Sequence, residues 1–391
     1  MSGSDPFCPS RRFGRGAALT LVFASVLVAG AATGALPGDG GGRGATSERA
    51  RATAPTSNPE AVRKAAEEAM AAGKSPLEAA ERAVSRSGDR WAAVYSEGEY
   101  EEFAESLDGQ YTGVGLQARR ERDGRIEVTE VRSGSPAAAA GIRAGDRLRS
   151  VDGRAVDGRP VTEVVSLLRG DATDAPAGTT VRLGLERGTR AWSETLRRAR
   201  LSTDSVTVRT LAPDVTVVAV AAFTKGVGDT VRTAVRDAPA GAGIVLDLRG
   251  NSGGLVTEAV STASVFLDGG LVATYDVDGE QRALHAEPGG DTDRPLVTLV
   301  DGGTMSAAEL LTGALQDRSR AVVVGSRTFG KGSVQMPSRL PDGSVAELTV
   351  GHYRTPSGRT VDGTGITPDV EAGDSALRQA ETVLSGLGDA S

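Results

Sequence analysis

Cysteine, histidine and aromatic residues are scarce in this sequence. Its 391 residues include one cysteine, two histidines and 4% aromatic residues. The single Cys8 excludes an internal disulfide framework and a thiolate metal site. The two histidines, His285 and His352, cannot build a histidine-rich metal site, so no metal ion is expected. The shortage of histidine also limits which groups could activate a nucleophile.

An excess of basic charge is also missing. The formal net charge is −7 at pH 7, whereas a general nucleic-acid-binding protein normally carries a basic face. No nucleic-acid partner is therefore expected. Hydrophobic residues make up 39% of the chain and charged residues 24%, values ordinary for a globular protein that buries a core. At ~150 residues per domain, the length indicates two or three domains.

An N-terminal stretch is a candidate export signal or membrane anchor. Arg11, Arg12 and Arg15 precede an uncharged stretch over residues 16–36, which is long enough for a marginal span of ~20 residues. Small residues at 32–35 could instead form a cleavage site, and a buried core helix is the alternative. Because basic residues keep the preceding end in the cytoplasm, we expect the rest of the chain outside it. The protein would be a single-pass membrane protein or secreted after cleavage.

The rest of the chain changes composition several times. A stretch rich in Gly, Ala, Thr, Ser and Arg is typical of a flexible linker, and alternating strand and helix patterns come later. The predicted parts are a cytoplasmic end with signal or anchor helix (1–36), a linker (37–57), a helical region (58–108), a β-rich module (109–200), an α/β region (201–373) and a C-terminal helix with tail (374–391).

The β-rich module contains an ordered series of features: a Gly-Val-Gly-Leu stretch before a strand, a short helix, a turn and an amphipathic helix over 161–168. This series resembles a PDZ domain. The resemblance implies that a peptide C-terminus adds as a strand beside residues 116–118, with the helix as the other wall. A β module without a ligand is the alternative. The implied binding residues are Val114, Gly115 and Leu116 for the carboxylate, Val161, Val165 and Leu168 in the groove, and Arg169 as a relay of occupancy.

The stretch "VVVGSRTFGKGSVQ", residues 322–335, superficially resembles a nucleotide-binding loop. A phosphate-binding loop ends in Gly-Lys followed by Ser or Thr and then a helix. Here Gly332 follows Lys331, and the next residues read as strands with a Pro-Asp-Gly turn. The nucleotide interpretation is therefore rejected.

Two serines are candidate nucleophiles. Ser252 lies in a Gly-Asn-Ser-Gly-Gly stretch, like the nucleophile of trypsin-like proteases, but in that fold the histidine base precedes the serine. His285 and His352 both follow Ser252. Ser306 begins a capping-box pattern at the start of a predicted helix, where free N–H groups and the positive helix end can stabilise an oxyanion.

Lys331 is the candidate base for Ser306. It follows a predicted helix and strand, and such a crossover can bring its turn back beside the start of the helix. Burial there would favour the neutral amine, which could take the serine proton without a histidine.

These motifs together resemble the carboxyl-terminal processing peptidases, or tail-specific proteases, over about residues 58–370. The matching stretches are residues 247–254, 306–317, 329–335 and 365–369. The resemblance implies an α+β multidomain protein with an N-terminal helical segment, a PDZ-like module and a mixed α/β peptidase core of the ClpP/crotonase-like type. It implies Ser306 as nucleophile, Lys331 as base and Gln335 as its orienting partner, with the amides of Ala307 and Gly253 or Gly254 as oxyanion hole.

The sequence departs from the family pattern at two places. Thr304-Met305 precedes the serine where Ser-Ala is usual, and Ser252 stands where proline is usual. Neither change removes a catalytic group, but both affect the geometry of the oxyanion hole.

The sequence thus predicts an extracytoplasmic serine endopeptidase that binds protein or peptide C-termini through its PDZ domain and cleaves near them. No cofactor is implied. A trypsin-like PDZ protease using Ser252 and a non-catalytic PDZ adaptor are the alternatives. The sequence leaves the natural substrate and the choice between monomer and homodimer open.

Overall fold

The computed structural model describes residues 58–170, 175–277 and 280–388. The predicted signal or anchor segment and the linker at 37–57 lie outside these residues. Among the helices that the structure describes, none combines the length and the apolar character needed to cross a membrane.

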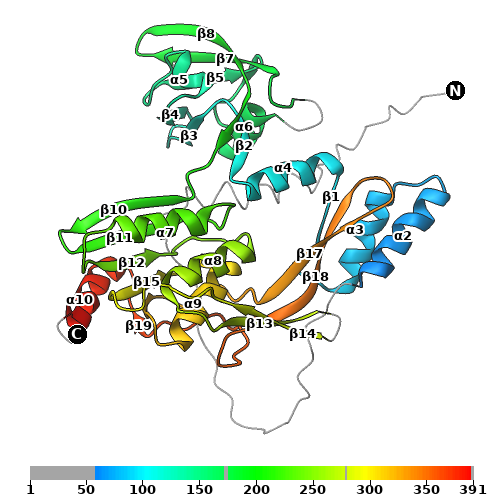
Figure 1. The fold of residues 1–391 in the computed structure, drawn as a ribbon. Coiled ribbons are helices and arrows are strands. Elements are labelled where there is room, and N and C mark those ends of the chain that lie inside the picture. Colours follow the sequence, from blue (N-terminus) through cyan, green and yellow to red (C-terminus); the bar gives the residue numbers. More distant parts are fainter. Residues whose placement is uncertain (1–57, 171–174, 278–279, 389–391) are drawn as a thin grey trace, which may run out of the picture.

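A six-stranded sheet forms the centre of the α/β region (Figure 1). Its first strand is antiparallel to the second, and all later neighbours are parallel. The central strands are nearly continuous apolar runs because a parallel sheet is covered on both faces. In spatial order the strands are β10 (Val206–Ala212), β11 (Val215–Val220), β12 (Gly243–Asp247), β15 (Leu296–Val300), β16 (Val322–Gly325) and β19 (Val370–Glu371).

Helices cover the two faces of this sheet. Alternate residues of β12 point to opposite faces, so Ile244 and Leu246 pack in one core cluster and Val245 in another. The first cluster includes residues of α7 (Val227–Asp237), α8 (Val256–Phe266) and α9 (Ala307–Asp317). The second contains the apolar stripe of α10 (Ala376–Gly388).

A second sheet joins the N-terminal region to the peptidase core. Strand β1 pairs antiparallel with β18, although the two are far apart in the sequence. The helices α2 and α3 pack their apolar faces against the β17–β18 hairpin through Val62, Ala66, Ala80, Val84 and Leu348. The elements are α2 (Pro59–Ala71), α3 (Pro76–Ser87), β1 (Ala93–Tyr95), β13 (Leu271–Val277), β14 (Glu280–His285), β17 (Ser333–Arg339) and β18 (Val345–Arg354).

The β-rich module forms a separate body with its own core (Figure 1). The chain enters it through β2 and leaves through β9, which pair with each other. In its sheet β3 pairs only with β4, so the other edge of β3 is open. The elements are β2 (Gln110–Gly113), β3 (Leu116–Arg120), β4 (Ile126–Val131), α5 (Pro136–Ala139), β5 (Arg147–Val151), β6 (Arg154–Ala155), α6 (Val161–Arg169), β7 (Thr180–Arg187), β8 (Arg190–Arg197) and β9 (Ala199–Ser202).

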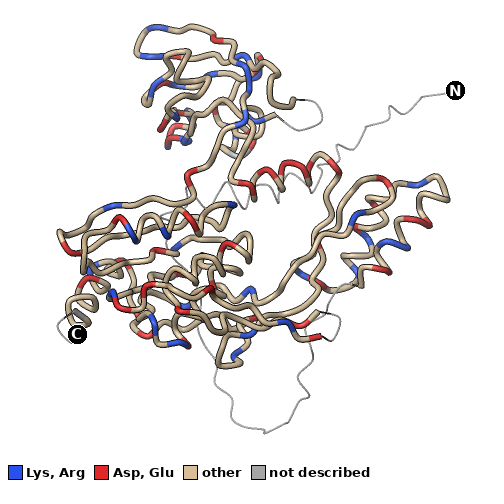
Figure 2. The backbone as a smooth tube through the Cα atoms, viewed as in Figure 1, with Lys and Arg blue, Asp and Glu red and all other residues tan. Residues whose placement is uncertain are grey.

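The helix α4 (Glu97–Leu107) leads from β1 to this module and is strongly acidic (Figure 2). Its Glu105 forms an ion pair with Arg200 on β9.

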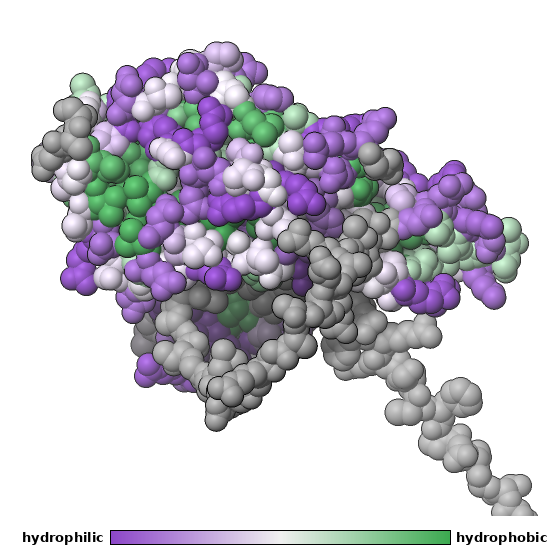
Figure 3. All heavy atoms as spheres, turned by 90° about the horizontal axis from the view of Figure 1, so that it is seen from below, coloured by the Kyte–Doolittle hydropathy of each residue, from purple (hydrophilic) through white to green (hydrophobic). Residues whose placement is uncertain are grey.

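Elsewhere the face seen from below mixes hydrophilic residues with small apolar patches (Figure 3). Two exposed large apolar side chains, Phe329 and Met336, flank the segment that carries Lys331. The predicted α+β multidomain fold is confirmed, whereas the exact domain boundaries stay predictions.

Candidate active site

The predicted catalytic residues lie in loops that follow neighbouring parallel strands. Gly253 follows β12, Ser306 follows β15 and Lys331 follows β16, and these strands are adjacent in the sheet. The carboxyl ends of parallel strands meet at one edge of a sheet, where α/β proteins place their ligand sites. Topology therefore brings these three loops together.

Ser306 is held in a strained conformation at the turn before α9. Its φ is 55° and its ψ is −118°, a combination that non-glycine residues rarely adopt and that costs roughly 1–3 kcal/mol. The Tyr353 hydroxyl donates to the Ser306 carbonyl oxygen at 3.0 Å. The Gly253 backbone lies against this turn, since a Cβ on Gly253 would come within 2.9 Å of the Ser306 Cβ. Only glycine fits this position.

Glu309, on the first turn of α9, connects the loops of Ser306 and Lys331. Its Oε2 accepts the N–H of Ser306 at 3.0 Å and the N–H of Lys331 at 2.8 Å. Its Oε1 accepts the N–H of Gly330 and the hydroxyl of Thr328. Burial raises the pKa of the Glu309 carboxyl, and these four hydrogen bonds act in the opposite direction. One fully buried carboxylate thus sets the distance between the two predicted catalytic residues.

The loop after β12 is anchored by Asn251, which is fully buried. Its Nδ2 donates to the Val220 carbonyl oxygen at 2.9 Å, and its Oδ1 accepts the Gly253 N–H at 2.8 Å. The Gly253 amide is therefore occupied. By contrast, the amides of Gly254 and Ala307 donate to no group in the described parts of the chain. This leaves free N–H groups at Gly254, the residue after Gly253, and at Ala307, the residue after Ser306.

The backbones of Lys331 and Ser306 are connected by the Glu309 oxygen that accepts both N–H groups. The side-chain amine of Lys331 makes no such connection to Ser306. Burial lowers the pKa of Lys331, while the carboxylates of Glu347, Asp89 and Glu309 partly oppose this shift. The Nζ atom lies 5.0 Å from the ring centroid of Trp91. No hydrogen bond joins it to Ser306 or to any other described residue. Gln335 Nε2 donates to Ser333 Oγ at 3.0 Å instead.

The sequence analysis missed the contribution of the segment between α3 and β1. Asp89 accepts the backbone N–H of Trp91 at 3.0 Å and both the N–H and the hydroxyl of Thr349. Thr349 Oγ1 in turn accepts from Gln335 Nε2 at 3.4 Å. These contacts depend on the pairing of β1 with β18, which no local sequence motif predicts.

The two histidines do not form a catalytic group with Ser252. His285 lies on the edge strand β14, and His352 on β18 faces Asp362 at 4.0 Å. No hydrogen bond links either histidine to Ser252 in the described chain. The trypsin-like arrangement therefore has no support in the geometry.

The PDZ module places most of the predicted binding residues together. Val114 and Gly115 form the turn between β2 and β3, and α6 contacts β3 next to its open edge. Gly115 has a φ of 79°, and a Cβ there would clash with Ser135, so the turn requires glycine. The Arg169 guanidinium lies 5.3 Å from the Tyr111 ring. Burial lowers the pKa of Arg169, and the Tyr111 hydroxyl and the Glu102 carboxylate oppose this.

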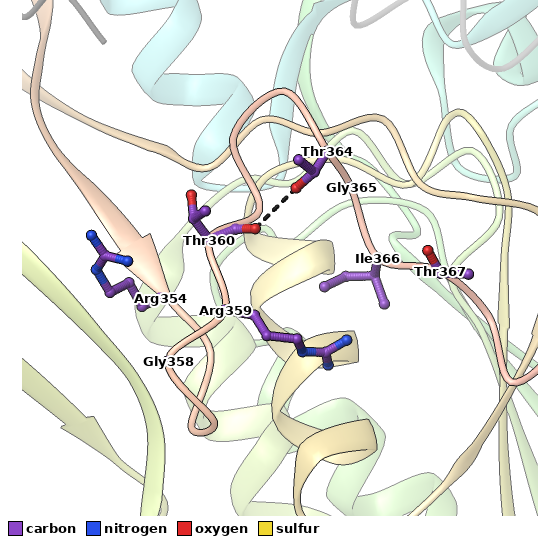
Figure 4. A pocket seen from close by; sticks show the side chains of 8 residues that line it. All are labelled: Arg354, Gly358, Arg359, Thr360, Thr364, Gly365, Ile366 and Thr367. Carbon is purple, nitrogen blue, oxygen red and sulfur yellow. Dashed lines mark hydrogen bonds between the residues drawn. The ribbon is translucent and has the colours of Figure 1, made fainter. Parts of the chain in front are cut away.

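A separate cavity of about 370 Å³ lies along the segment after β18 (Figure 4). Arg359 in its wall points to the C-terminal end of α9 and bonds Gln316 and Asp317 there. This is the opposite end of the helix from Ser306. The cavity therefore does not contain the predicted catalytic residues.

Comparison with known proteins decides the family. Residues 214–372 match the model of peptidase family S41, and residues 127–187 match that of the PDZ domain. The chain belongs to peptidase family S41. The predicted resemblance to the carboxyl-terminal processing peptidases is confirmed.

Several proteins with similar sequences are named carboxy-terminal processing proteases. The S41 member is 31% identical over 289 residues to the carboxy-terminal processing protease CtpA of Bacillus subtilis (strain 168), across 73% of this chain and 61% of that protein. It is 33% identical over 280 residues to the carboxy-terminal-processing protease of Bartonella bacilliformis, across 69% and 63%. It thus spans less than two thirds of the length of these relatives. The solved photosystem II D1 C-terminal processing protease is 29% identical, with a TM-score of 0.51 over 80% of this chain and 86% of that one.

Proposed function

We propose that this S41 member is a serine endopeptidase that uses Ser306 as nucleophile and Lys331 as general base. The observation that carries the proposal is the shared Glu309 oxygen, which accepts the backbone N–H groups of both residues. The strained turn at Ser306 and the free amides of Ala307 and Gly254 support it.

In the proposed reaction Ser306 Oγ attacks the scissile carbonyl carbon, and its proton passes to the neutral Lys331 amine. The oxyanion accepts hydrogen bonds from the amides of Ala307 and Gly254, which are worth most in a site without water. Collapse breaks the C–N bond, and Lys331 returns the proton to the leaving amine. Water then attacks the acyl-enzyme, again with Lys331 as the base, and Ser306 is regenerated. Gln335 orients the amine in this scheme.

A neutral lysine is needed for this chemistry. Desolvation lowers the pKa of Lys331 because burial disfavours the charged form. The carboxylates of Glu347, Asp89 and Glu309 act in the opposite direction and favour the ammonium. Activity is therefore expected to fall as the pH drops through the pKa of Lys331.

We further propose that substrates are recognised by their C-termini. The open edge of β3, the glycine turn at Val114–Gly115 and the adjacent α6 supply the strand-addition groove that such binding needs. Export from the cytoplasm is part of the same proposal. Its support is the uncharged stretch at 16–36 behind three arginines, which lies outside the described residues.

The test is to compare the peptides released from an unfolded protein substrate by the wild type, Ser306→Ala and Ser252→Ala, using mass spectrometry. Ser306→Ala should release none, because the acyl-enzyme cannot form. Ser252→Ala should retain substantial activity, since its hydroxyl forms no hydrogen bond with a base in the described chain. An active Ser306→Ala protein with an inactive Ser252→Ala protein would overturn the assignment.

A further inference from the structure

The amine of Lys331 rests on an aromatic ring from the N-terminal region. Its Nζ lies 5.0 Å from the centroid of the Trp91 ring, within the ~6 Å over which an aromatic face attracts a cation. Phe329 packs against the same indole at 5.7 Å between centroids. The guanidinium of Arg90 lies 4.8 Å from the Trp91 ring as well. The ring of Trp91 is thus a place that favours cations.

The indole N–H of Trp91 is buried and finds no hydrogen-bond partner among the described residues. A buried polar group without a partner is costly, so this side chain is not explained by satisfied packing alone. The backbone of Trp91 is nevertheless held in place. Asp89 accepts the backbone N–H of Trp91 and also accepts the N–H and the hydroxyl of Thr349 on β18. The position of the ring is therefore specified despite its cost.

The charged groups around the Lys331 amine come from several elements. Glu347 on β18, Asp89 before β1 and Glu309 on α9 favour the ammonium, whereas burial opposes it. The guanidinium of Arg90 lies over the same Trp91 ring. Neither Glu347 nor Glu309 forms an ion pair with Lys331 among the described residues. The Trp91 ring contacts the amine, with its centroid 5.0 Å from Nζ.

We propose that Trp91 is a positioning residue for the general base. Its ring holds the Lys331 ammonium in a resting place where it makes no hydrogen bond to Ser306, and the dyad forms when the deprotonated amine leaves the ring. The attraction acts on the charged form alone, so Trp91 couples dyad formation to loss of the proton. This inference rests on the proposed Ser306–Lys331 chemistry.

The direct test uses tryptophan fluorescence and needs no activity. The chain has two tryptophans, so Trp192→Phe leaves Trp91 as the only emitter. Its emission should titrate with a midpoint below the ordinary lysine pKa of about 10.4, because burial lowers the pKa of Lys331. Adding Lys331→Met should abolish this titration. Emission that does not titrate, or a titration that persists in Lys331→Met, would overturn the proposal.

The kinetic test uses Trp91→Leu, which removes the aromatic face but keeps an apolar side chain. The acid limb of kcat/KM should move to lower pH by about half to one unit, raising activity on that limb about three- to tenfold. The high-pH plateau and KM should stay within about twofold of wild type, since a neutral amine is not attracted to the ring. Trp91→Phe should shift the limb less.

Trp192→Leu is the matched control. Trp192 also lies near two guanidinium groups, those of Arg187 and Arg190, but on the PDZ module. It should leave the acid limb unchanged. An unmoved limb in Trp91→Leu, or a fall of the plateau without a shift, would show a purely structural role for Trp91. If Trp91→Leu does not fold, the pH profile of Trp91→Phe and the fluorescence titration decide whether Trp91 positions the base.

The two proposals fail in different ways. Activity that survives Ser306→Ala or Lys331→Met would remove the proposed catalytic dyad. If both variants are inactive while the Trp91→Leu profile equals that of wild type, only the role of Trp91 is refuted.

Discussion

Replacing Glu309 by glutamine tests the connection between the two catalytic loops. The side chain keeps its size, but one of its two oxygens becomes an NH₂ group that can only donate. If the amide nitrogen replaces Oε2, the N–H groups of Ser306 and Lys331 both lose their acceptor. If it replaces Oε1, only the Gly330 N–H is stranded, because the Thr328 hydroxyl can turn to accept.

The second orientation is therefore the less costly one. An unpaired buried donor costs about 1–3 kcal/mol, so the free energy of unfolding should fall by roughly that amount. The loop of Lys331 would also lose the Gly330 bond, one of its three hydrogen bonds to the Glu309 carboxylate. Misplacement of a general base lowers kcat, and a fall of at least about tenfold is expected, which corresponds to ~1.4 kcal/mol of transition-state stabilisation. KM should change little, because Glu309 is fully buried and cannot touch substrate.

Urea denaturation and steady-state kinetics on one peptide substrate measure both effects. Glu347→Gln is the matched control, since Glu347 also faces Lys331 but accepts no hydrogen bond from the described residues. Its stability should stay within about 1 kcal/mol of wild type. A Glu309→Gln protein with wild-type kcat and unchanged stability would refute the view that this carboxylate holds the two loops together.

Two further predictions concern the base and the PDZ module. Lys331→Arg should be inactive at every pH, because the guanidinium keeps its proton in proteins. The wild type should lose activity as the pH falls through the lowered pKa of Lys331; a pH–rate profile measures both, and an active Arg variant would exclude Lys331 as base. Amidation of a peptide C-terminus should weaken its cleavage at least about tenfold, since charge-assisted hydrogen bonds are worth roughly 1.5–3 kcal/mol each. Competition between free and amidated peptides, with a Gly115→Val protein as control, measures this, and equal cleavage by the intact enzyme would remove C-terminal recognition.

Much of the fold could be predicted from local patterns. The continuous apolar runs of β12 and β15 identify buried parallel strands, because only a sheet covered on both faces tolerates them. Ser306 at the start of a helix and Lys331 after the next strand are also local signals, and adjacent parallel strands are enough to place their loops at one sheet edge. The ordered series of features that begins with the glycine turn before β3 likewise predicts the PDZ module.

The details of the site could not be predicted in the same way. Glu309 appears in the sequence as half of a helix cap, and only the folded chain shows that it also accepts the amides of Gly330 and Lys331. Only the folded chain shows that the buried Asn251 accepts the Gly253 N–H, whereas the amides of Gly254 and Ala307 donate to no group in the described chain.

The sequence by itself determined which residues carry the chemistry and which strands and helices present them, because these depend on residue type, spacing and periodicity over short stretches. Only the tertiary structure decided what surrounds the base. Asp89 and Trp91 reach Lys331 through the pairing of β1 with β18, a contact between distant segments. Hydrogen bonds and burial across such a contact depend on the whole packed core, and no local pattern encodes them.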